Sequence, residues 1–338
     1  MSDSDADLQE DPGYIIYQKA IISANLNSTI FLAMIMGMYF IVFLGTMHIY
    51  FSRKKEHNKA VMGTIIALFL LVLAQVSINW YFVNHAIVEA GDTRFSIFVE
   101  STTVPPAMQI GTMFCQYLGY ILADGLMVWR CYQMCGRLWL RVSPTLILFV
   151  GEIALCITSI TMNNTNIDDH SDAHTRLVNK VTGSLSALVA ATSVFATVTI
   201  TYCIVTATSQ DKYARKRYMR IADIVLQSSA VYSLSAVGLA VLALVPSESV
   251  DIIAGFSGYF YLSALTSIFT GFAPTLMVAR VALISDKMAK ASTTRTQHIS
   301  DIRFGGGGNT SSSNTSGDAR DTDMEAGAGG NIQSKEHI

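Results

Sequence analysis

Seven long apolar stretches limit what this chain can fold into. Each is rich in Leu, Ile, Val, Ala, Phe and Met, and each has about the 20 residues that an α-helix needs to cross a bilayer. Because backbone polar groups in lipid must be bonded within their own segment, we expect helices rather than strands. The stretches are 28–50, 61–83, 108–129, 142–162, 181–207, 221–245 and 254–280. The sequence therefore predicts an all-α membrane protein with a seven-transmembrane helix bundle over 28–280.

The composition excludes several classes of protein. Of the 338 residues, 51% are hydrophobic and only 14% are charged, whereas a soluble domain carries roughly 25% charged residues. The formal net charge of −2 gives no basic field for holding a phosphate backbone, so we expect no nucleic-acid partner. The partner that the composition predicts is the lipid bilayer.

The distribution of Lys and Arg predicts the orientation. Basic residues concentrate in the connections 51–60, 130–141 and 208–220. They are sparse in the other set, which comprises 1–27, 84–107, 163–180 and 246–253. Since basic connections stay in the cytosol, the N-terminus is expected outside and the C-terminus inside, with the plasma membrane as the favoured location.

The two ends of the chain differ from the body. Residues 1–27 are acidic and lack the basic region of a cleaved signal peptide, so we expect an extracellular segment. Residues 281–338 are expected to form a cytoplasmic tail, in which 281–290 either continues the last helix or bends along the membrane surface. From about 291, Ser, Thr, Gly, Asn and Asp dominate, which predicts disorder.

Ionisable side chains at membrane depth are the first functional candidates, because burying them in lipid is expensive. Glu152 lies nearest the middle of its stretch, and Gln75 and Asn79 lie four residues apart on one helix face. One hypothesis makes Gln75, Asn79 and Glu152 a ligand-binding set. The alternative is that these polar groups simply bond neighbouring helices together.

A second group of candidate functional residues lies near the ends of the third and seventh stretches. Arg130 could pair with Asp223 as a latch between two helix packings, or it could serve as an interfacial anchor. Pro274 removes a helix hydrogen bond, which predicts either a hinge or a tolerated kink. The hypothetical switch or ionic contacts are Asp124, Arg130, Asp223, Pro274 and Arg280.

The sequence motifs for glycosylation and for metal binding are less specific than the features described above. Asn27 and Asn163 begin glycosylation sequons on the side expected outside. His170 and His174 have the spacing of a zinc pair on a helix, but a solvated loop is the commoner form of such a stretch, so no metal site is predicted. No cluster of His and acidic residues converges at the membrane, so we expect neither a cofactor nor enzyme activity.

Two sequence motifs are similar to motifs found in other membrane proteins. The chain has D-G-L-M-V-W-R-C-Y at Asp124–Tyr132 and A-P-T-L-M-V-A-R at Ala273–Arg280. These resemble a family of seven-span membrane proteins of mushroom-forming fungi whose function is not established, and the resemblance implies a seven-helix architecture. The layout also looks like that of G-protein-coupled receptors, although Trp-Arg-Cys-Tyr replaces Asp-Arg-Tyr and Ala-Pro-Thr-Leu-Met replaces Asn-Pro-x-x-Tyr.

Two functions follow as expectations. The receptor-like layout implies sensing of an extracellular or lipidic ligand and signalling to a cytosolic partner at the basic 208–220 loop. The alternative is a transporter or exporter of a lipid or small molecule, with Gln75, Asn79, Asp124 and Glu152 lining a polar path. The seventh stretch has no lysine before Arg280, which excludes a retinal pigment of the usual kind.

Overall fold

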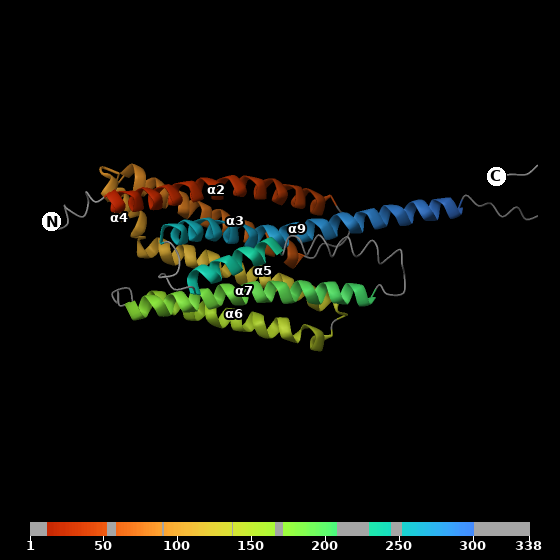
Figure 1. The fold of residues 1–338 in the computed structure, drawn as a ribbon. Coiled ribbons are helices and arrows are strands. Elements are labelled where there is room, and N and C mark those ends of the chain that lie inside the picture. The colour runs from red at the N-terminus through yellow and green to blue at the C-terminus, as the bar shows by residue number, and fades with distance from the viewer. Residues whose placement is uncertain are drawn as a thin grey trace, which may run out of the picture. The chain divides into compact units, whose positions relative to one another are not determined.

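The structure is a computed structural model that describes residues 12–52, 59–89, 91–136, 138–165, 172–207, 230–244 and 252–300. The regular elements among these residues are all helical, which confirms the all-α class (Figure 1). They are α2 (Pro12–Phe51), α3 (Lys59–Asn84), the π-helix η1 (His85–Glu89), α4 (Arg94–Thr102), α5 (Pro106–Met134), α6 (Trp139–Thr165), α7 (Asp172–Ala207), a helix at Ala230–Leu244 and α9 (Ile252–Ser300).

Five of the described helical segments are long and apolar enough to cross a membrane, which indicates an integral membrane protein. Each contains most or all of one predicted stretch. The segments are Pro12–Phe51, Lys59–Glu89, Trp139–Asn163, Arg176–Cys203 and Ile253–Arg280.

The third predicted stretch and the described part of the sixth are helical, but neither meets the same criteria of length and apolar character. Helix α5 covers 108–129, but polar residues such as Gln109, Gln116 and Asp124 reduce its apolar character. The sixth stretch is described only over Ala230–Leu244, which is too short to span a bilayer by itself. The number of seven spans therefore stays a prediction.

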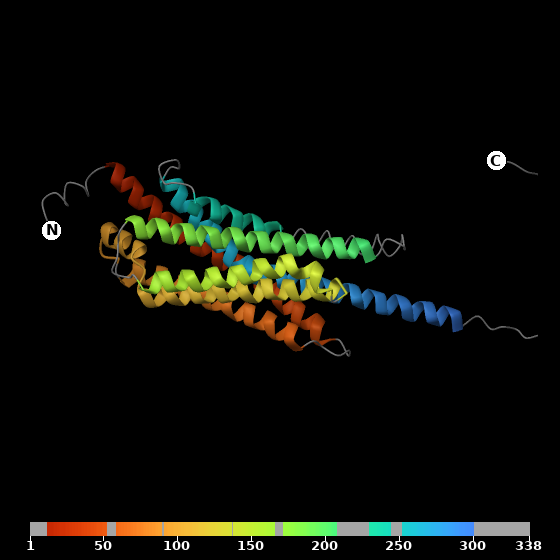
Figure 2. The same ribbon diagram turned by 90° about the horizontal axis from the view of Figure 1, so that it is seen from below.

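Helix α5 occupies the centre of the bundle, where it packs against α3, α6 and α7 (Figures 1 and 2). Its start is set by Pro106, because proline suits the first turn of a helix, where no amide donor is needed. Its end is set by Gly136, whose φ of 68° is the left-handed conformation that closes helices. A helix surrounded by protein can carry polar side chains that a lipid-facing helix cannot.

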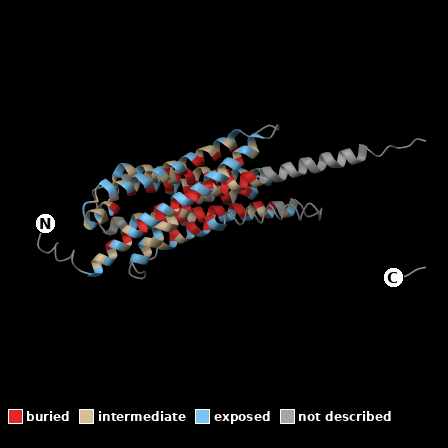
Figure 3. Ribbon diagram, turned by 90° about the horizontal axis from the view of Figure 1, so that it is seen from above, coloured by how far each residue is buried: buried red, intermediate tan, exposed pale blue. Residues whose placement is uncertain are grey.

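The outward faces of the bundle are apolar. Leu140 is 89% exposed and Ile147 is 71% exposed, whereas Asp124 and Glu152 are completely buried. Figure 3 shows the buried positions on the inward faces of the helices and the exposed positions on the outward faces. Large apolar side chains facing out around polar ones facing in are typical of a protein whose solvent is lipid.

Small residues allow close helix packing within the bundle. A Cβ on Gly183 would lie 2.7 Å from Leu244, and a Cβ on Gly238 would lie 2.9 Å from Leu262. These two contacts bring the Ala230–Leu244 helix against α7 and α9. Small residues at such crossings are a common means of joining helices in membranes.

The first and last helices extend beyond the ranges that the sequence predicts for the bundle. Helix α2 begins at Pro12, so 12–27 is helical and continuous with the predicted first span. Helix α9 continues to Ser300, so 291–300 is helical in the structure, whereas the sequence predicts disorder from about 291. The remaining parts of the two predicted terminal segments, 1–11 and 301–338, lie outside the described residues. By contacts the chain divides into one unit up to Ala289, which holds the bundle, and a second from Lys290 onward.

Helix α4 was not anticipated from the sequence. Its first turn is closed by a capping box, in which the Thr93 hydroxyl accepts from the Ser96 amide and the Ser96 hydroxyl accepts from the Thr93 amide. Arg94 Nε donates to Gln18 Oε1 at 2.9 Å, which links α4 to α2. We call this the cavity end of the bundle, where α5, α7 and α9 begin and α6 ends. The opposite end is called the disulfide end.

Candidate functional site

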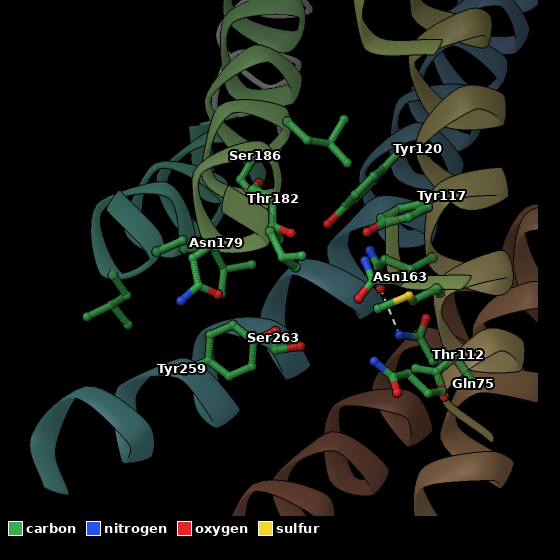
Figure 4. A pocket seen from close by; sticks show the side chains of 18 of the residues that line it. Gln75, Thr112, Tyr117, Tyr120, Asn163, Asn179, Thr182, Ser186, Tyr259 and Ser263 are labelled. Atoms are coloured by element: carbon green, nitrogen blue, oxygen red, sulfur yellow. Dashed lines mark hydrogen bonds between the residues drawn. The ribbon is translucent and has the colours of Figure 1, made fainter. Parts of the chain in front are cut away.

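A cavity of about 530 Å³ lies near the cavity end (Figure 4). Its walls come from α3, α5, α6, α7, α9 and the Ala230–Leu244 helix. This volume lies within the range of roughly 300–1,000 Å³ that is usual for small-molecule sites. The cavity is therefore the strongest candidate for a binding site in the described part of the chain.

A hydrogen-bonded triad joins three helices at the cavity wall. Gln75 Nε2 on α3 donates to Gln116 Oε1 on α5 at 2.7 Å and to Ser267 Oγ on α9 at 3.0 Å. The Ser267 hydroxyl donates to the same Gln116 oxygen at 2.7 Å. Because each of these groups has a partner, the triad fixes the relative positions of three cavity-forming helices.

Two tyrosines form another part of the wall. The Tyr117 and Ser159 hydroxyls lie 2.8 Å apart, which links α5 to α6. Tyr120 comes one turn later on α5, and Figure 4 shows its hydroxyl directed toward the side of the cavity occupied by Thr182. The aromatic rings supply apolar surface while their hydroxyls remain available for hydrogen bonds.

The chemistry of the lining defines the kind of ligand that fits. Side-chain amides and hydroxyls alternate with apolar groups such as Met113, Leu239 and Phe256, and none of the described lining residues is charged. Burying a charged ligand group without a countercharge is expensive, whereas amides and hydroxyls pair well with neutral donors and acceptors. The cavity suits an uncharged molecule that has both polar groups and an apolar body.

A pair of carboxyl groups lies deeper in the bundle. Asp124 on α5 and Glu152 on α6 are fully buried and lie at hydrogen-bonding distance from each other. Among the described residues, no donor is directed with good hydrogen-bond geometry at any of their four oxygens. Asp124 follows Tyr120 by four residues on α5, which places the pair about 6 Å deeper than the tyrosine on the same face of the helix.

The predicted ligand set is only partly brought together. Gln75 lines the cavity as expected. Asn79 instead donates to the backbone oxygen of Gln75 at 3.0 Å and does not line the cavity. Glu152 faces Asp124 below the cavity rather than the two amides. Of the three, only Gln75 lines this cavity, and their joint role in binding a ligand stays a prediction.

The sequence reading missed most of the α5 contribution. Gln109, Thr112, Gln116 and Tyr120 all line the cavity, and they recur at intervals of three or four residues. This spacing places them on one face of the helix. A polar stripe along an otherwise apolar segment was the signal that could have identified them.

Two of the predicted switch residues have partners outside that set. Asp124 faces another acid and not a cation, while Arg130 interacts with Tyr50 on α2. Asp223 lies outside the described residues, so its pairing with Arg130 stays a prediction. Pro274 is buried within α9, which continues through it as a helix. Arg280 lies half-buried one and a half turns further along.

The two glycosylation candidates occupy different environments. Asn27 is exposed within α2 and donates to Ser23 Oγ at 3.0 Å. Asn163 lines the cavity and donates to the Ser159 backbone oxygen at 2.9 Å. A side chain that faces a cavity is poorly placed to carry a glycan, so Asn163 is disfavoured as an acceptor.

A disulfide joins α5 to α7 at the disulfide end. Cys135 and Cys203 are bonded, with their Cα atoms 5.4 Å apart. Both belong to an apolar cluster that includes Met127, Ile200 and Met277. The sequence alone does not indicate this pairing, because the two cysteines are separated by 68 residues.

Similarity to known proteins adds nothing to this geometry. The chain matches no protein-family model, no curated protein and no solved structure. The resemblance to the fungal seven-span family therefore stays a prediction, and the function must be argued from the chemistry of the cavity.

Proposed function

We propose that the protein is a receptor-like, non-enzymatic membrane protein that binds an uncharged small molecule in the cavity. The observation that carries this proposal is a cavity of about 530 Å³ whose described lining has many amides and hydroxyls but no charge. In this proposal the ligand enters from outside the cell, and a cytosolic partner recognises the basic 208–220 loop. The plasma membrane is the proposed location.

The proposal includes seven spans. Five segments qualify by length and apolar character, and α5 at Pro106–Met134 is long enough to be a sixth. Its polar residues are compatible with a span because α5 is surrounded by α3, α6 and α7. The Ala230–Leu244 helix is proposed to be part of the remaining span, whose predicted range is 221–245.

The orientation follows from the charge bias. The cavity end includes the connection 91–93 and the start of α5, which belong to the set of connections with few basic residues. The positive-inside rule therefore favours a cavity that opens toward the outside. This orientation suits the reception of an extracellular or lipidic ligand.

Closure of the disulfide end favours a receptor over a transporter. Apolar side chains from α5, α6, α7 and α9 pack together there, and the Cys135–Cys203 bond ties α5 to α7. A polar solute would have to separate this packing to pass through. One observation favours the alternative of transport, because buried acids such as Asp124 and Glu152 are typical of proton relays in transporters.

Ligand binding can be tested by thermal stabilisation of the purified protein in detergent. The probes are a panel of neutral compounds, namely monosaccharides, sterols and long-chain alcohols. A binder should raise the unfolding temperature of the wild type, because a ligand stabilises the state that it binds. Replacing Tyr120 by Phe should weaken that effect, whereas Ser77→Ala, on an exposed face of α3, should not.

Receptor and transporter make different predictions for a confirmed binder. A receptor should pass the signal on, so the binder should change the amount of cytosolic protein that copurifies with the chain from crosslinked cells. A transporter should move the radiolabelled binder across liposomes that contain the purified protein. Flux without any change in cytosolic partners would contradict the receptor proposal.

A further inference from the structure

In the described part of the chain, the two buried acids beneath the cavity have no positively charged side chain beside them to neutralise two negative charges. Asp124 and Glu152 are each completely buried. In the described part of the chain, no Lys, Arg or His interacts with either carboxyl group. Two adjacent carboxylates out of water repel each other and lose their hydration, so the pair requires a bound cation.

The contact between the two acids favours a proton as that cation. Their carboxyl groups lie at hydrogen-bonding distance from each other. A proton fits between two carboxyl oxygens at this separation and provides the donor that both groups otherwise lack. A metal ion between the same oxygens would require the two groups to move apart.

A third side chain points to the same site from another helix. Tyr232, on the Ala230–Leu244 helix, is only 2% exposed, and its hydroxyl interacts electrostatically with both acids. No partner with good hydrogen-bond geometry is found for this hydroxyl among the described residues. A buried hydroxyl beside two buried carboxyl groups can donate a hydrogen bond to a carboxylate oxygen of the pair.

The other neighbours of the pair do not titrate near neutral pH or do not titrate at all. Helix α6 contributes the Cys156 thiol, and α5 contributes the Tyr120 phenol through its interaction with Tyr232. Helix α7 presents Thr192 beside Glu152, and α9 presents Thr270 beside Tyr232. The acids are therefore the groups in this cluster that can exchange a proton near neutral pH.

The site is connected to the cavity and closed on its other side. Tyr120 lines the cavity and interacts with Tyr232, which in turn interacts with the acids. Toward the disulfide end, Met127 and Met277 belong to the apolar cluster that contains the disulfide. Proton exchange through the tyrosine hydroxyls from the cavity is thus easier than exchange through the apolar cluster.

We infer that Asp124 and Glu152 form a proton-binding site about one helical turn below the cavity residue Tyr120, with one proton shared between the two carboxyl groups. Binding converts a pair with charge −2 into one with charge −1, and no other bond is formed or broken. Loss of the proton leaves two like charges between α5 and α6, which weakens the packing of those helices. The inference concerns the apoprotein and does not depend on the identity or the existence of a cavity ligand.

Infrared difference spectroscopy of the purified protein tests the site directly. The wild type at neutral pH should show the carbonyl stretch of a buried protonated carboxylic acid, and this band should shift in heavy water. The double variant Asp124→Asn/Glu152→Gln should lose the band, because each single variant leaves one buried acid that burial still favours in its protonated form. Asp92→Asn, which makes the same chemical change at an exposed position, should retain it.

The pH dependence of stability provides a second readout. The folded pair holds a proton that an exposed carboxyl in the unfolded chain releases at neutral pH, so folding stability should fall as the pH rises. The unfolding temperature of the wild type should drop by about 3 °C per pH unit while the proton is being lost. The double variant Asp124→Asn/Glu152→Gln should flatten this dependence, and Asp92→Asn should preserve it.

Three results would overturn the inference. One is the absence of the protonated-acid band in the folded wild type, a measurement that needs no variant to fold. Another is an unchanged pH profile in the folded double variant Asp124→Asn/Glu152→Gln. The third is stabilisation of the wild type, but not of this double variant, by sodium chloride relative to choline chloride, which would assign the site to sodium. Failure of the cavity to bind neutral probes would affect none of these measurements.

Discussion

Gln116 uses one side-chain oxygen to accept two hydrogen bonds, from Gln75 and Ser267. A buried group that accepts from two other helices fixes their rotation as well as their distance. The residue that organises the cavity wall is therefore an uncharged amide on α5, and not one of the ionisable side chains that first attract attention.

Replacing Gln116 by Leu keeps the approximate volume and removes the acceptor. Gln75 would be left with one unsatisfied buried N–H, while Ser267 could still donate to the Ser263 backbone oxygen, so the change should cost about 1–3 kcal/mol of stability. Thermal unfolding in detergent measures this loss. Ser77→Ala on α3 serves as the control, because its exposed hydroxyl bonds only to the Leu73 backbone oxygen. Equal stability of the two variants would contradict the structural role of the triad.

Gly271 is a second residue whose identity is set by packing. A Cβ at this position would lie 2.7 Å from the Tyr39 hydroxyl oxygen and 3.1 Å from Val72. The Tyr39 ring cannot readily move, since it is fully buried and its hydroxyl lies 3.3 Å from that of Thr275. Glycine is thus required where α9 passes closest to α2 and α3.

Gly271→Ala should destabilise the bundle by about 1–3 kcal/mol, the usual cost of overpacking. Gly63→Ala provides the matched control, because a Cβ there meets no atom within 4 Å. That substitution should be neutral or stabilise the protein by up to about 1 kcal/mol, since alanine favours the helix. Chemical unfolding of both variants checks the difference, and a reversed order would show that the α2–α9 contact is not as close as described.

At the scale of elements, α5 connects the cavity to the disulfide end. Along a single helix it carries cavity residues, the acid Asp124 and finally Cys135. A movement of α5 caused by a ligand or by proton loss would therefore reach the disulfide. The bond to α7 limits how far the two helices can separate there.

The Cys135–Cys203 bond predicts a redox-dependent stability. It closes a loop with a sequence separation of 68 residues, and a crosslink over such a loop contributes about 2–4 kcal/mol. A reducing agent should lower the unfolding temperature of the wild type and leave that of Cys203→Ser unchanged. In the proposed orientation this end faces the cytosol, where thiols are kept reduced, so we expect the bond to form in air after cell lysis.

Alkylation under denaturing conditions counts the free thiols in the same samples. Two fewer cysteines should react in the oxidised wild type than in the reduced protein, with Cys135 and Cys203 protected. Modification of both residues without prior reduction would contradict the bond. Cys115, which is unpaired in the structure, provides an internal positive control.

The extents of the helices show what the sequence could and could not predict. The predicted 61–83 and 142–162 are close to α3 and α6, because a long apolar run surrounded by polar residues has one stable form in lipid. The start of α2 at Pro12 was missed because the mixed polar and apolar residues before 28 have no membrane-like pattern. Helix α4 depends on a capping box, a local signal that hydropathy does not detect.

The site was less predictable than the helices for a physical reason. The sequence identifies Glu152 and Asp124 as ionisable residues whose burial in a membrane costs free energy. It does not identify their partners, because these depend on how each helix is rotated about its axis and on how deep each residue lies in the bundle. The structure pairs the two acids with each other and leaves Gln75 to bond with Gln116 and Ser267. Only packing in three dimensions supplies that information.

For the molecule as a whole, the central claim is that the helix bundle is surrounded by lipid. Apolar side chains face outward, and amides, hydroxyls and acids face inward. The described residues supply five clear candidate spans, and the two further spans of the proposal are α5 and the predicted stretch 221–245. An odd number of spans places the two termini on opposite sides, but that result alone does not distinguish five spans from seven.

A membrane-impermeant maleimide distinguishes these topologies when it labels single introduced cysteines in intact cells. Labelling of the wild type measures the background from the native cysteines. Seven spans with an outside N-terminus predict labelling of Asp92→Cys and Ser247→Cys in intact cells. The same topology predicts labelling of Ser52→Cys and Ser209→Cys only after the membrane is permeabilised. Labelling of Ser209→Cys and Ser247→Cys from the same side, or protection of Asp92→Cys in intact cells, would contradict the account.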